Sequence, residues 1–230
     1  MNNLSVIIPF YNEEHFIADS IDRVLNDDIY EEIFLVDDCS TDSSALIAKK
    51  YANNNDKIKY IKSEKNGGKG NAIKEAINFI NSTHTVFHDA DLEYFPKDIV
   101  EMHKLSLENE NSMILGSRFI GSKKRLNIYS RTYIANRVMS TFFSFVNLYR
   151  ITDIATCYKL VPTNFLKNTN FKENGFSFEI EILSKFLKYN KSVYEVPISY
   201  EGRSYEEGKK IKTIDGFLYL INTLRYKFFN

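Results

Sequence analysis

Two aspartates separated by one small residue are the first residues of this chain that could do chemistry. Asp89 and Asp91 flank Ala90, directly after a short apolar run at 85–87. Two carboxylates at this spacing in a turn can hold a hard divalent cation such as Mg²⁺ or Mn²⁺, which takes oxygen ligands and leaves room for phosphate oxygens. A cation there would offset the charge of a departing diphosphate. Alone the pattern is weak, because aspartates are common in loops and helix caps.

Other polar clusters also follow apolar runs. Asp37 and Asp38 could cap the next helix or hydrogen-bond to a ribose or a base edge. The glycine-rich segment 67–70 could bring backbone amides and Lys69 near phosphates. It is not a nucleoside triphosphate loop, because Gly70 follows Lys69 where Ser or Thr is required. The first apolar run lacks the glycine triplet of dinucleotide folds, which argues against a nicotinamide dehydrogenase.

The elements that must position these residues alternate between strand and helix. Apolar runs predict strands at 4–10, 33–36, 58–61, 85–87, 113–115 and 192–198, and helical spacing predicts helices at 13–26, after 42, after 70, and at 131–149, 177–188 and 212–229. This order predicts an α/β fold with a mostly parallel central sheet flanked by helices. Ligands bind outside the carboxyl ends of such strands, so the clusters at 11–14, 37–42 and 88–93, with Arg118, should converge. No linker or repeat interrupts the chain, which predicts a single domain over 1–230.

The composition excludes some classes of partner. Thirty basic residues balance thirty acidic ones, so no global field favours nucleic acid. Cys39 and Cys157 are far apart and in no metal-ligand spacing, which is typical of reduced thiols in a cytoplasmic protein. The N-terminus has no basic region or cleavage site of a secretory signal, and no run approaches the ~18 apolar residues of a membrane span. Any membrane role is therefore expected to be peripheral, at the cytoplasmic face.

Taken together and in order, the motifs are far more specific than any one of them. Segments 6–14, 36–42, 68–72, 89–93 and 116–119 resemble family 2 glycosyltransferases of the GT-A fold. The later segments 153–159, 178–181 and 196–200, with Arg203, Gly208, Lys209 and Lys210, resemble the branch of dolichyl-phosphate mannose or glucose synthases. The resemblance covers almost the whole chain and implies a nucleotide-sugar-binding half (1–120) and an acceptor-binding half (121–230).

The resemblance also implies roles for individual residues. A UDP- or GDP-sugar donor would be bound by Pro9, Tyr11, Glu13, Asp38, Lys69, Asp89 and Ala90. The ligands of Mg²⁺ or Mn²⁺ would be Asp89, Asp91 and Glu93. Arg118, Arg131 and Arg203 would form a cationic clamp on phosphates, a task that suits the planar guanidinium fork. A solvated arginine remains the alternative for each, and His88 is expected to make a hydrogen bond rather than bind metal.

The implied reaction is one inverting displacement at the anomeric carbon of a hexose, with polyprenyl (dolichyl or undecaprenyl) phosphate as acceptor. A phosphate monoester, with its second pKa near ~6, is largely ionised at neutral pH, so positioning and charge neutralisation should carry most of the rate. Asp91 and the three arginines would act at the diphosphate. Asp153 is the candidate acceptor-side carboxylate or weak base, or else a structural cap. Ala155 stands where this branch often has an acidic residue, which removes a second carboxylate.

A lipid acceptor requires the protein to reach a membrane surface. Residues 203–230 hold six basic and three acidic side chains, and the last predicted helix also carries Phe217, Leu220, Leu224 and Phe228. An amphipathic helix at the surface and packing against the core both fit this pattern. The basic run 123–125 could meet anionic lipid heads or be solvated. A separate membrane partner is a further possibility. The alternatives for function are transfer to a growing surface glycan and a non-catalytic nucleotide-sugar-binding module.

Overall fold

The computed structural model describes residues 3–127, 129–203 and 213–229. Its strands are β1 (Leu4–Phe10), β2 (Tyr30–Asp37), β3 (Ile58–Lys62), β4 (His84–Phe87), β5 (Met113–Ser117), β6 (Arg125–Leu126), β7 (Lys159–Pro162), β8 (Val193–Pro197) and β9 (Tyr200–Glu201). Its helices are α1 (Ile17–Leu25), α2 (Ser44–Asn54), α3 (Lys69–Ile77), α4 (Lys97–Glu108), α5 (Ser130–Asn147), α6 (Thr163–Asn168), α7 (Phe178–Tyr189) and α8 (Thr213–Phe228). Gly208, Lys209 and Lys210, named above for the family resemblance, lie outside the described residues.

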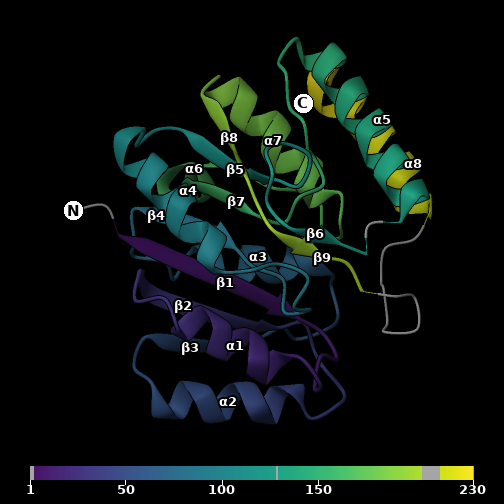
Figure 1. Ribbon diagram of the computed structural model, residues 1–230. Helices are drawn as coiled ribbons and strands as arrows, with labels where there is room; N and C mark the ends of the chain where they lie inside the picture. The colour runs from purple at the N-terminus through teal and green to yellow at the C-terminus, as the bar shows by residue number, and fades with distance from the viewer. Residues whose placement is uncertain (1–2, 128, 204–212, 230) are drawn as a thin grey trace.

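Seven strands form one sheet with helices on both faces (Figure 1). The strand order is β3-β2-β1-β4-β7-β5-β8, and all neighbours are parallel except β7, which is antiparallel to β4 and to β5. The mostly parallel α/β sheet predicted from the sequence is therefore confirmed. The halves 1–120 and 121–230 both contribute strands to it.

The central strands are continuous apolar runs because both of their faces are covered. All seven residues of β1 are buried, as are the last six of β2. A strand buried on both sides does not alternate apolar with polar residues, which is typical of parallel sheets under two layers of helices. The same runs that identified these strands in the sequence thus form the core.

Strand β7, inside the sheet, and helix α4, which packs against β5 and β7, have no clear signal in the sequence. β7 is four residues long, begins with Lys159 and ends with Pro162, yet all four residues are buried. The sequence analysis assigned no strand there and no helix to α4 (97–108). A buried lysine at the start of a strand is stable only when tertiary neighbours supply its partners, so local pattern alone does not predict β7.

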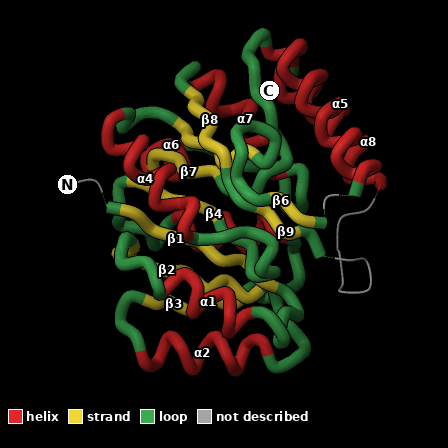
Figure 2. The backbone as a smooth tube through the Cα atoms, viewed as in Figure 1, coloured by secondary structure: helices red, strands yellow, loops and turns green. Residues whose placement is uncertain are grey.

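A small second sheet lies over the carboxyl end of β4. β6 pairs with β9, Tyr94 forms a bridge with Tyr200, and the Glu201 N–H donates to the Glu93 carbonyl (2.9 Å). Figure 2 shows this pair on the side where the loop leaves the end of β1. The chain after β8 therefore returns to the edge where the polar clusters were expected.

Helices α5 and α8 pack side by side at the end of the molecule opposite α2, and α8 also contacts α7 (Figures 1 and 2). One face of α8 is buried through Tyr219, Asn222, Thr223 and Tyr226. The other faces of the pair expose large apolar side chains, namely Tyr133, Ile134, Val138 and Phe145 on α5 and Phe217, Leu218, Ile221, Leu224 and Phe228 on α8. The last helix thus packs on the domain and keeps an exposed apolar surface, and contact of that surface with a membrane stays a prediction. None of the described helices is long and apolar enough to cross a membrane.

Candidate active site

The loops after β1 and β2 are tied to each other at the carboxyl edge of the sheet, and Arg203 contacts both Glu13 in the first of them and Asp91 in the loop after β4. The Asn12 amide donates to Ser40 Oγ (3.1 Å), and the Glu13 amide donates to Ser44 Oγ (2.8 Å). Each loop contains one non-glycine residue in the left-handed conformation: Asn12 (φ 51°), Cys39 (φ 65°) and Leu92 (φ 62°). Such conformations cost of order 1 kcal/mol or more and persist where the surroundings fix them. The convergence expected from the sequence is thus present, with strained backbone in all three loops.

Asp89 is the better neutralised of the two aspartates. Its Oδ1 lies 2.7 Å from the ammonium of Lys69, the first residue of α3, and Cys157 donates its thiol proton to the same carboxylate. Burial opposes ionisation of Asp89, but Lys69 and Cys157 outweigh it and hold the pKa of Asp89 below its usual value. Lys69, placed near phosphates by the sequence analysis, therefore contacts Asp89 directly.

Asp91 lies in a crowded acidic cluster with one guanidinium. Arg203 places Nη2 3.1 Å from Asp91 Oδ2 and Nη1 3.3 Å from Glu13 Oε2. Burial first, then the charges of Asp89 and Glu93, raise the pKa of Asp91 to about 7. Glu13, Asp91, Glu93 and Arg203 together carry a net charge of −2 when all four are ionised. This excess of negative charge fits a divalent cation.

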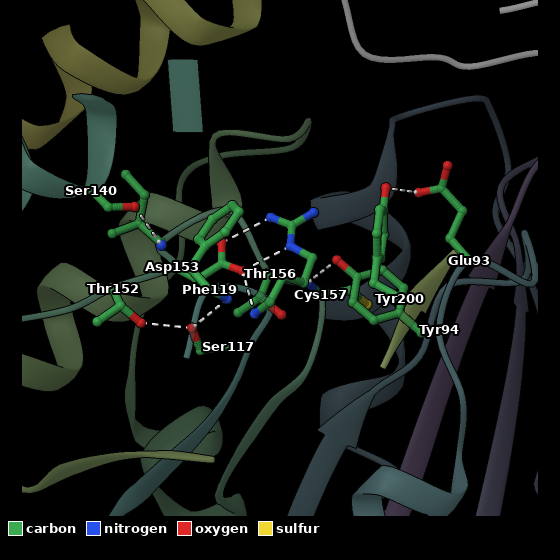
Figure 3. Close-up of polar contacts among 12 residues, drawn as sticks. Glu93, Tyr94, Ser117, Phe119, Ser140, Thr152, Asp153, Thr156, Cys157 and Tyr200 are labelled. Carbon is green, nitrogen blue, oxygen red and sulfur yellow. Dashed lines mark hydrogen bonds and ion pairs between the residues drawn. The ribbon is translucent and has the colours of Figure 1, made fainter. Parts of the chain in front are cut away.

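The carboxylate oxygens available here favour a cation whose remaining coordination positions are filled by a substrate. Within the described residues, no three acidic, histidine or cysteine side chains converge as a complete metal site. Mg²⁺ in phosphoryl sites is commonly held by one or two carboxylates, with substrate phosphates and water completing its shell. Glu93 uses both oxygens elsewhere, since Oε2 accepts from Tyr200 (2.6 Å; Figure 3) and Oε1 from the Arg203 amide (2.8 Å). Asp89 and Asp91 therefore fit a shared metal better than Glu93 does.

Asp38 and the glycine segment contact each other rather than facing outward separately. The amides of Gly67 and Gly68 donate to the two carboxylate oxygens of Asp38, at 2.8 and 2.7 Å. Those two amides are therefore used inside the fold and do not form a ready-made phosphate cradle. Of the other expected donor-binding residues, Pro9 and Ala90 are buried, whereas Tyr11 is half-buried beside the Asn12 loop. The nucleoside roles of these residues stay predictions.

Arg118 and Asp153 form a buried two-point ion pair. Arg118 Nε lies 2.7 Å from Asp153 Oδ2 and Nη2 lies 2.8 Å from Oδ1, and the Arg118 amide also donates to Oδ2 (3.0 Å). Asp153 is fully buried, and both of its carboxylate oxygens accept from Arg118. The geometry favours a positioning role for Asp153 over a role as a base. Arg131 lies apart from this pair, exposed in the first turn of α5.

A cavity joins this ion pair to the start of α5. Its volume is about 10 Å³, and it is lined by Arg118, Phe119, Asn127, Tyr129, Thr132, Asn136 and Tyr200. The Arg118 guanidinium lies 5.1 Å from the centre of the Tyr200 ring, and the Tyr200 hydroxyl donates to Glu93. The cavity is thus adjacent to the acidic cluster. Lys123 and Arg125 are not available to lipid heads as a run, because Lys123 pairs with Asp98 (2.8 Å) and Arg125 donates to loop carbonyls.

His88 is a buried residue behind the site whose role the sequence predicted, whereas two tyrosines beside it were missed. His88 is fully buried between Ser20 (3.2 Å) and Tyr158 (3.0 Å), and burial lowers its pKa to about 4. Its expected hydrogen-bonding role, rather than metal binding, agrees with these contacts. Tyr94 and Tyr200 were not singled out, although the Cys157 amide donates to the Tyr94 hydroxyl (3.1 Å; Figure 3). Single tyrosines in an aromatic-rich chain are indistinguishable from core residues, so spacing does not reveal them.

Comparison with known proteins places the chain in a family. A model of glycosyl transferase family 2 matches residues 5–169. Dolichyl-phosphate beta-glucosyltransferase of Dictyostelium discoideum is 27% identical over 224 residues, which span 86% of this chain and 66% of that protein. Dolichol-phosphate mannosyltransferase of Pyrococcus furiosus is 28% identical over 224 residues, which span 94% of this chain and 61% of that protein. The chain thus spans less than two thirds of the length of each of these relatives.

The fold is also similar to a solved enzyme structure. Glucosyl-3-phosphoglycerate synthase from Mycobacterium tuberculosis, in complex with Mn²⁺, UDP-glucose and phosphoglyceric acid, superposes with a TM-score of 0.75 at 17% identity, covering 98% of this chain and 79% of that one. At this identity the similarity concerns the fold alone, and it supports the GT-A architecture expected from the sequence. Because the family model matches most of its length, this chain belongs to glycosyl transferase family 2 and is a glycosyltransferase with the GT-A fold.

Proposed function

We propose that this glycosyltransferase moves a hexose from a UDP- or GDP-sugar to a polyprenyl phosphate, with inversion at the anomeric carbon. The observation that carries the acceptor is the Arg118 guanidinium beside Tyr200, at the mouth of a small cavity that reaches the first turns of α5. This cavity joins the acidic cluster to a helix with an exposed apolar face. The two named dolichyl-phosphate transferases among the relatives, and the UDP-glucose and Mn²⁺ of the similar structure, support the same choice.

On the donor side, Asp89 and Asp91 would hold Mg²⁺ or Mn²⁺. When bound, the ion supplies charge neutralisation for the diphosphate as it leaves. Arg203 already lies against Asp91, and its Nε is buried without a hydrogen-bond partner among the described residues. A phosphate oxygen of the donor would satisfy that nitrogen. Pro9, Tyr11, Glu13, Asp38 and Ala90 are proposed to border the nucleoside and sugar.

On the acceptor side, the chain supplies position and charge rather than a strong base. The acceptor phosphate attacks the anomeric carbon as the bond to the nucleoside diphosphate breaks. A phosphate monoester is already largely ionised at neutral pH, so no proton has to be removed by the protein. Asp153 is accordingly proposed to orient Arg118 through their two-point pair, and the exposed Arg131 to meet the incoming phosphate.

The apolar surface of α5 and α8 supports a lipid-linked acceptor. Thr132 and Asn136 line the cavity, while Tyr133, Ile134 and Val138 on the same helix are exposed. An acceptor phosphate that binds beside Arg118, at the mouth of this small cavity, would therefore leave its polyprenyl chain along the apolar face. We propose peripheral contact with the cytoplasmic face of a membrane on these grounds, with or without a separate membrane protein.

An acceptor panel tests the proposal. The protein is incubated with Mn²⁺, a set of UDP- and GDP-sugars, and polyprenyl phosphate or short saccharides. The products are identified by mass spectrometry, and their anomeric configuration is determined by NMR. A sugar-phospholipid with inverted anomeric configuration is expected. Product with a saccharide alone would replace this acceptor with a growing glycan. Donor binding that Asp91→Ala leaves unchanged, without turnover of any acceptor, would instead indicate a binding module.

A further inference from the structure

A chain of four charged side chains of alternating sign runs beneath the site. Asp89 lies 2.7 Å from Lys69, Lys69 lies 2.8 Å from Glu179, and Glu179 lies 2.5 Å from Lys159. The Lys159 side chain is 0% exposed and that of Glu179 3%. The four charges cancel. The reaction described above uses Asp89, which Lys69 neutralises, but assigns nothing to Glu179 or Lys159.

Lys159 also holds the turn that precedes β7. Its ammonium donates to the carbonyls of Ile154 (3.3 Å) and Thr156 as well as to Glu179. This turn carries Asp153, which forms the ion pair with Arg118, and Cys157, which donates to Asp89. Lys159 therefore connects the donor-side carboxylate to the acceptor-side ion pair through one buried nitrogen.

The glycine-rich segment 67–70 allows Lys69 and Glu179 to approach each other. A Cβ on Gly70 would lie 2.7 Å from the Glu173 carbonyl and 2.8 Å from Phe178 Cβ, and Gly68 has a φ of +92° against Asn174. The segment therefore packs backbone to backbone on the loop before α7. This contact places Lys69 beside Glu179, in the first turn of α7.

We propose that Glu179 and Lys159 are positioning residues for sugar transfer, which hold Lys69 and the 153–157 turn so that the Asp89 carboxylate keeps its place at the metal site. This inference rests on the proposed role of Asp89 and Asp91 as ligands of the divalent ion. The pair also sets the charge beside that ion. Removing Glu179 leaves an uncompensated positive charge next to Asp89, whereas removing Lys159 leaves a negative one.

The sign of the charge change separates this role from a merely structural one. Mn²⁺ binding is measured by electron paramagnetic resonance, with UDP or GDP present, for wild type, Glu179→Gln, Lys159→Met and the double variant. We expect Glu179→Gln to weaken Mn²⁺ binding about tenfold, Lys159→Met to leave it equal or tighter, and the double variant to return within about threefold of wild type. The kcat for transfer should fall in both single variants with the donor KM changed less.

Glu32→Gln is the matched control. Glu32 pairs with Lys59 at 2.5 Å, as Glu179 does with Lys159, but at the amino-terminal end of β2 and away from the site. It should leave Mn²⁺ binding within twofold of wild type despite a loss of stability. Equal losses of Mn²⁺ affinity in all three site variants, or the same loss in Glu32→Gln, would overturn the positioning role.

The two proposals fail in different ways. If the wild type binds no Mn²⁺ with either nucleotide, the proposed function falls and the positioning role falls with it. If the wild type binds Mn²⁺ and Glu179→Gln behaves like Glu32→Gln, the positioning role alone is wrong. Should Glu179→Gln not fold, Lys159→Met decides, because Mn²⁺ binding weaker by more than threefold in that variant contradicts the expected sign.

Discussion

The two aspartates of the Asp-x-Asp motif are alike in sequence and opposite in environment. Asp89 faces Lys69 and the Cys157 thiol, which keep its pKa low. Asp91 is buried near Asp89 and Glu93, with Arg203 as its cation, and its pKa is raised to about 7. The two residues are of the same type, so their surroundings cause the difference. The fold neutralises the charge of Asp89, whereas it leaves an excess of negative charge around Asp91 for a ligand.

This difference predicts opposite effects on stability. Asp91→Asn removes one of several crowded carboxylates, so the metal-free protein should gain about 2–4 °C in Tm, equivalent to about 1 kcal/mol at this size. Mn²⁺-dependent sugar transfer should fall at least about 100-fold. Asp89→Asn is the matched control and should lower the Tm, because it leaves the ammonium of Lys69 short of a carboxylate. A lower Tm for metal-free Asp91→Asn, measured by scanning calorimetry, would contradict this account.

Sequence order could predict which loops meet at the site but not which charges pair. Glu13, Asp91 and Arg203 come together because their segments follow strands of one sheet, or return to its edge. The pairing of Arg118 with Asp153 bridges 35 residues, and that of Lys159 with Glu179 bridges 20. Each pair depends on β7 lying between β4 and β5, and a four-residue strand starting with lysine has no distinctive local pattern.

At the scale of elements, helix α3 depends on a glycine that a helix would normally disfavour. Gly70→Ala should cost about 1–3 kcal/mol of unfolding free energy, because its methyl group would overlap the Glu173 carbonyl and Phe178. Gly216→Ala, in α8, should instead gain about 0.5–1 kcal/mol, since its methyl group meets Met139 at an ordinary 3.5 Å. Urea unfolding of both variants measures the difference. A stabilised Gly70→Ala would show that the α3–α7 contact is looser than described.

Glu32 joins strand β2 to its neighbours. Its hydrogen bonds predict part of the way in which the stability of the protein changes at acid pH. Glu32 accepts from Ser5 on β1, Lys59 on β3 and Asn81. Burial opposes its ionisation, but these partners outweigh burial and lower its pKa to about 2. The unfolded carboxyl has a higher pKa, so Glu32 adds stability that is complete above pH ~4.5 and is lost as the pH falls towards 2. Glu32→Gln should therefore flatten the stability curve over this window by up to about 3 kcal/mol. An equal loss of stability in wild type and variant over this pH window would show that Glu32 does not cause the loss.

At the scale of the whole molecule, the acidic cluster of the site and the exposed apolar surface of α5 and α8 are separate regions that lie near each other. The acidic cluster lies at the carboxyl edge of the sheet, and α5 and α8 stand side by side beyond it (Figure 1). Helices α5 and α8 carry four basic residues, Arg131, Arg137, Arg225 and Lys227, against one acidic residue, Asp215, and Arg225 pairs with Glu173 at 3.0 Å. An apolar face with this charge suits an anionic lipid surface. The sequence analysis weighed the last helix alone, because the contribution of α5 appears only when the two helices are packed together.

Vesicle binding tests this surface directly. The protein should sediment with vesicles of phosphatidylcholine and phosphatidylglycerol, and more weakly with phosphatidylcholine alone or at high salt, because screening removes the electrostatic part. Val138→Ser with Phe145→Ser should weaken binding about tenfold or more, since these side chains are 58% and 78% exposed on α5. Leu46→Ser with Phe79→Ser, at 71% and 59% exposed, lies outside this helix pair and should leave binding unchanged. Equal losses of vesicle binding in the two double variants would show that exposed apolar area in general, rather than the α5–α8 face, drives adsorption. A protein that binds neither kind of vesicle would contradict the proposed contact with a membrane.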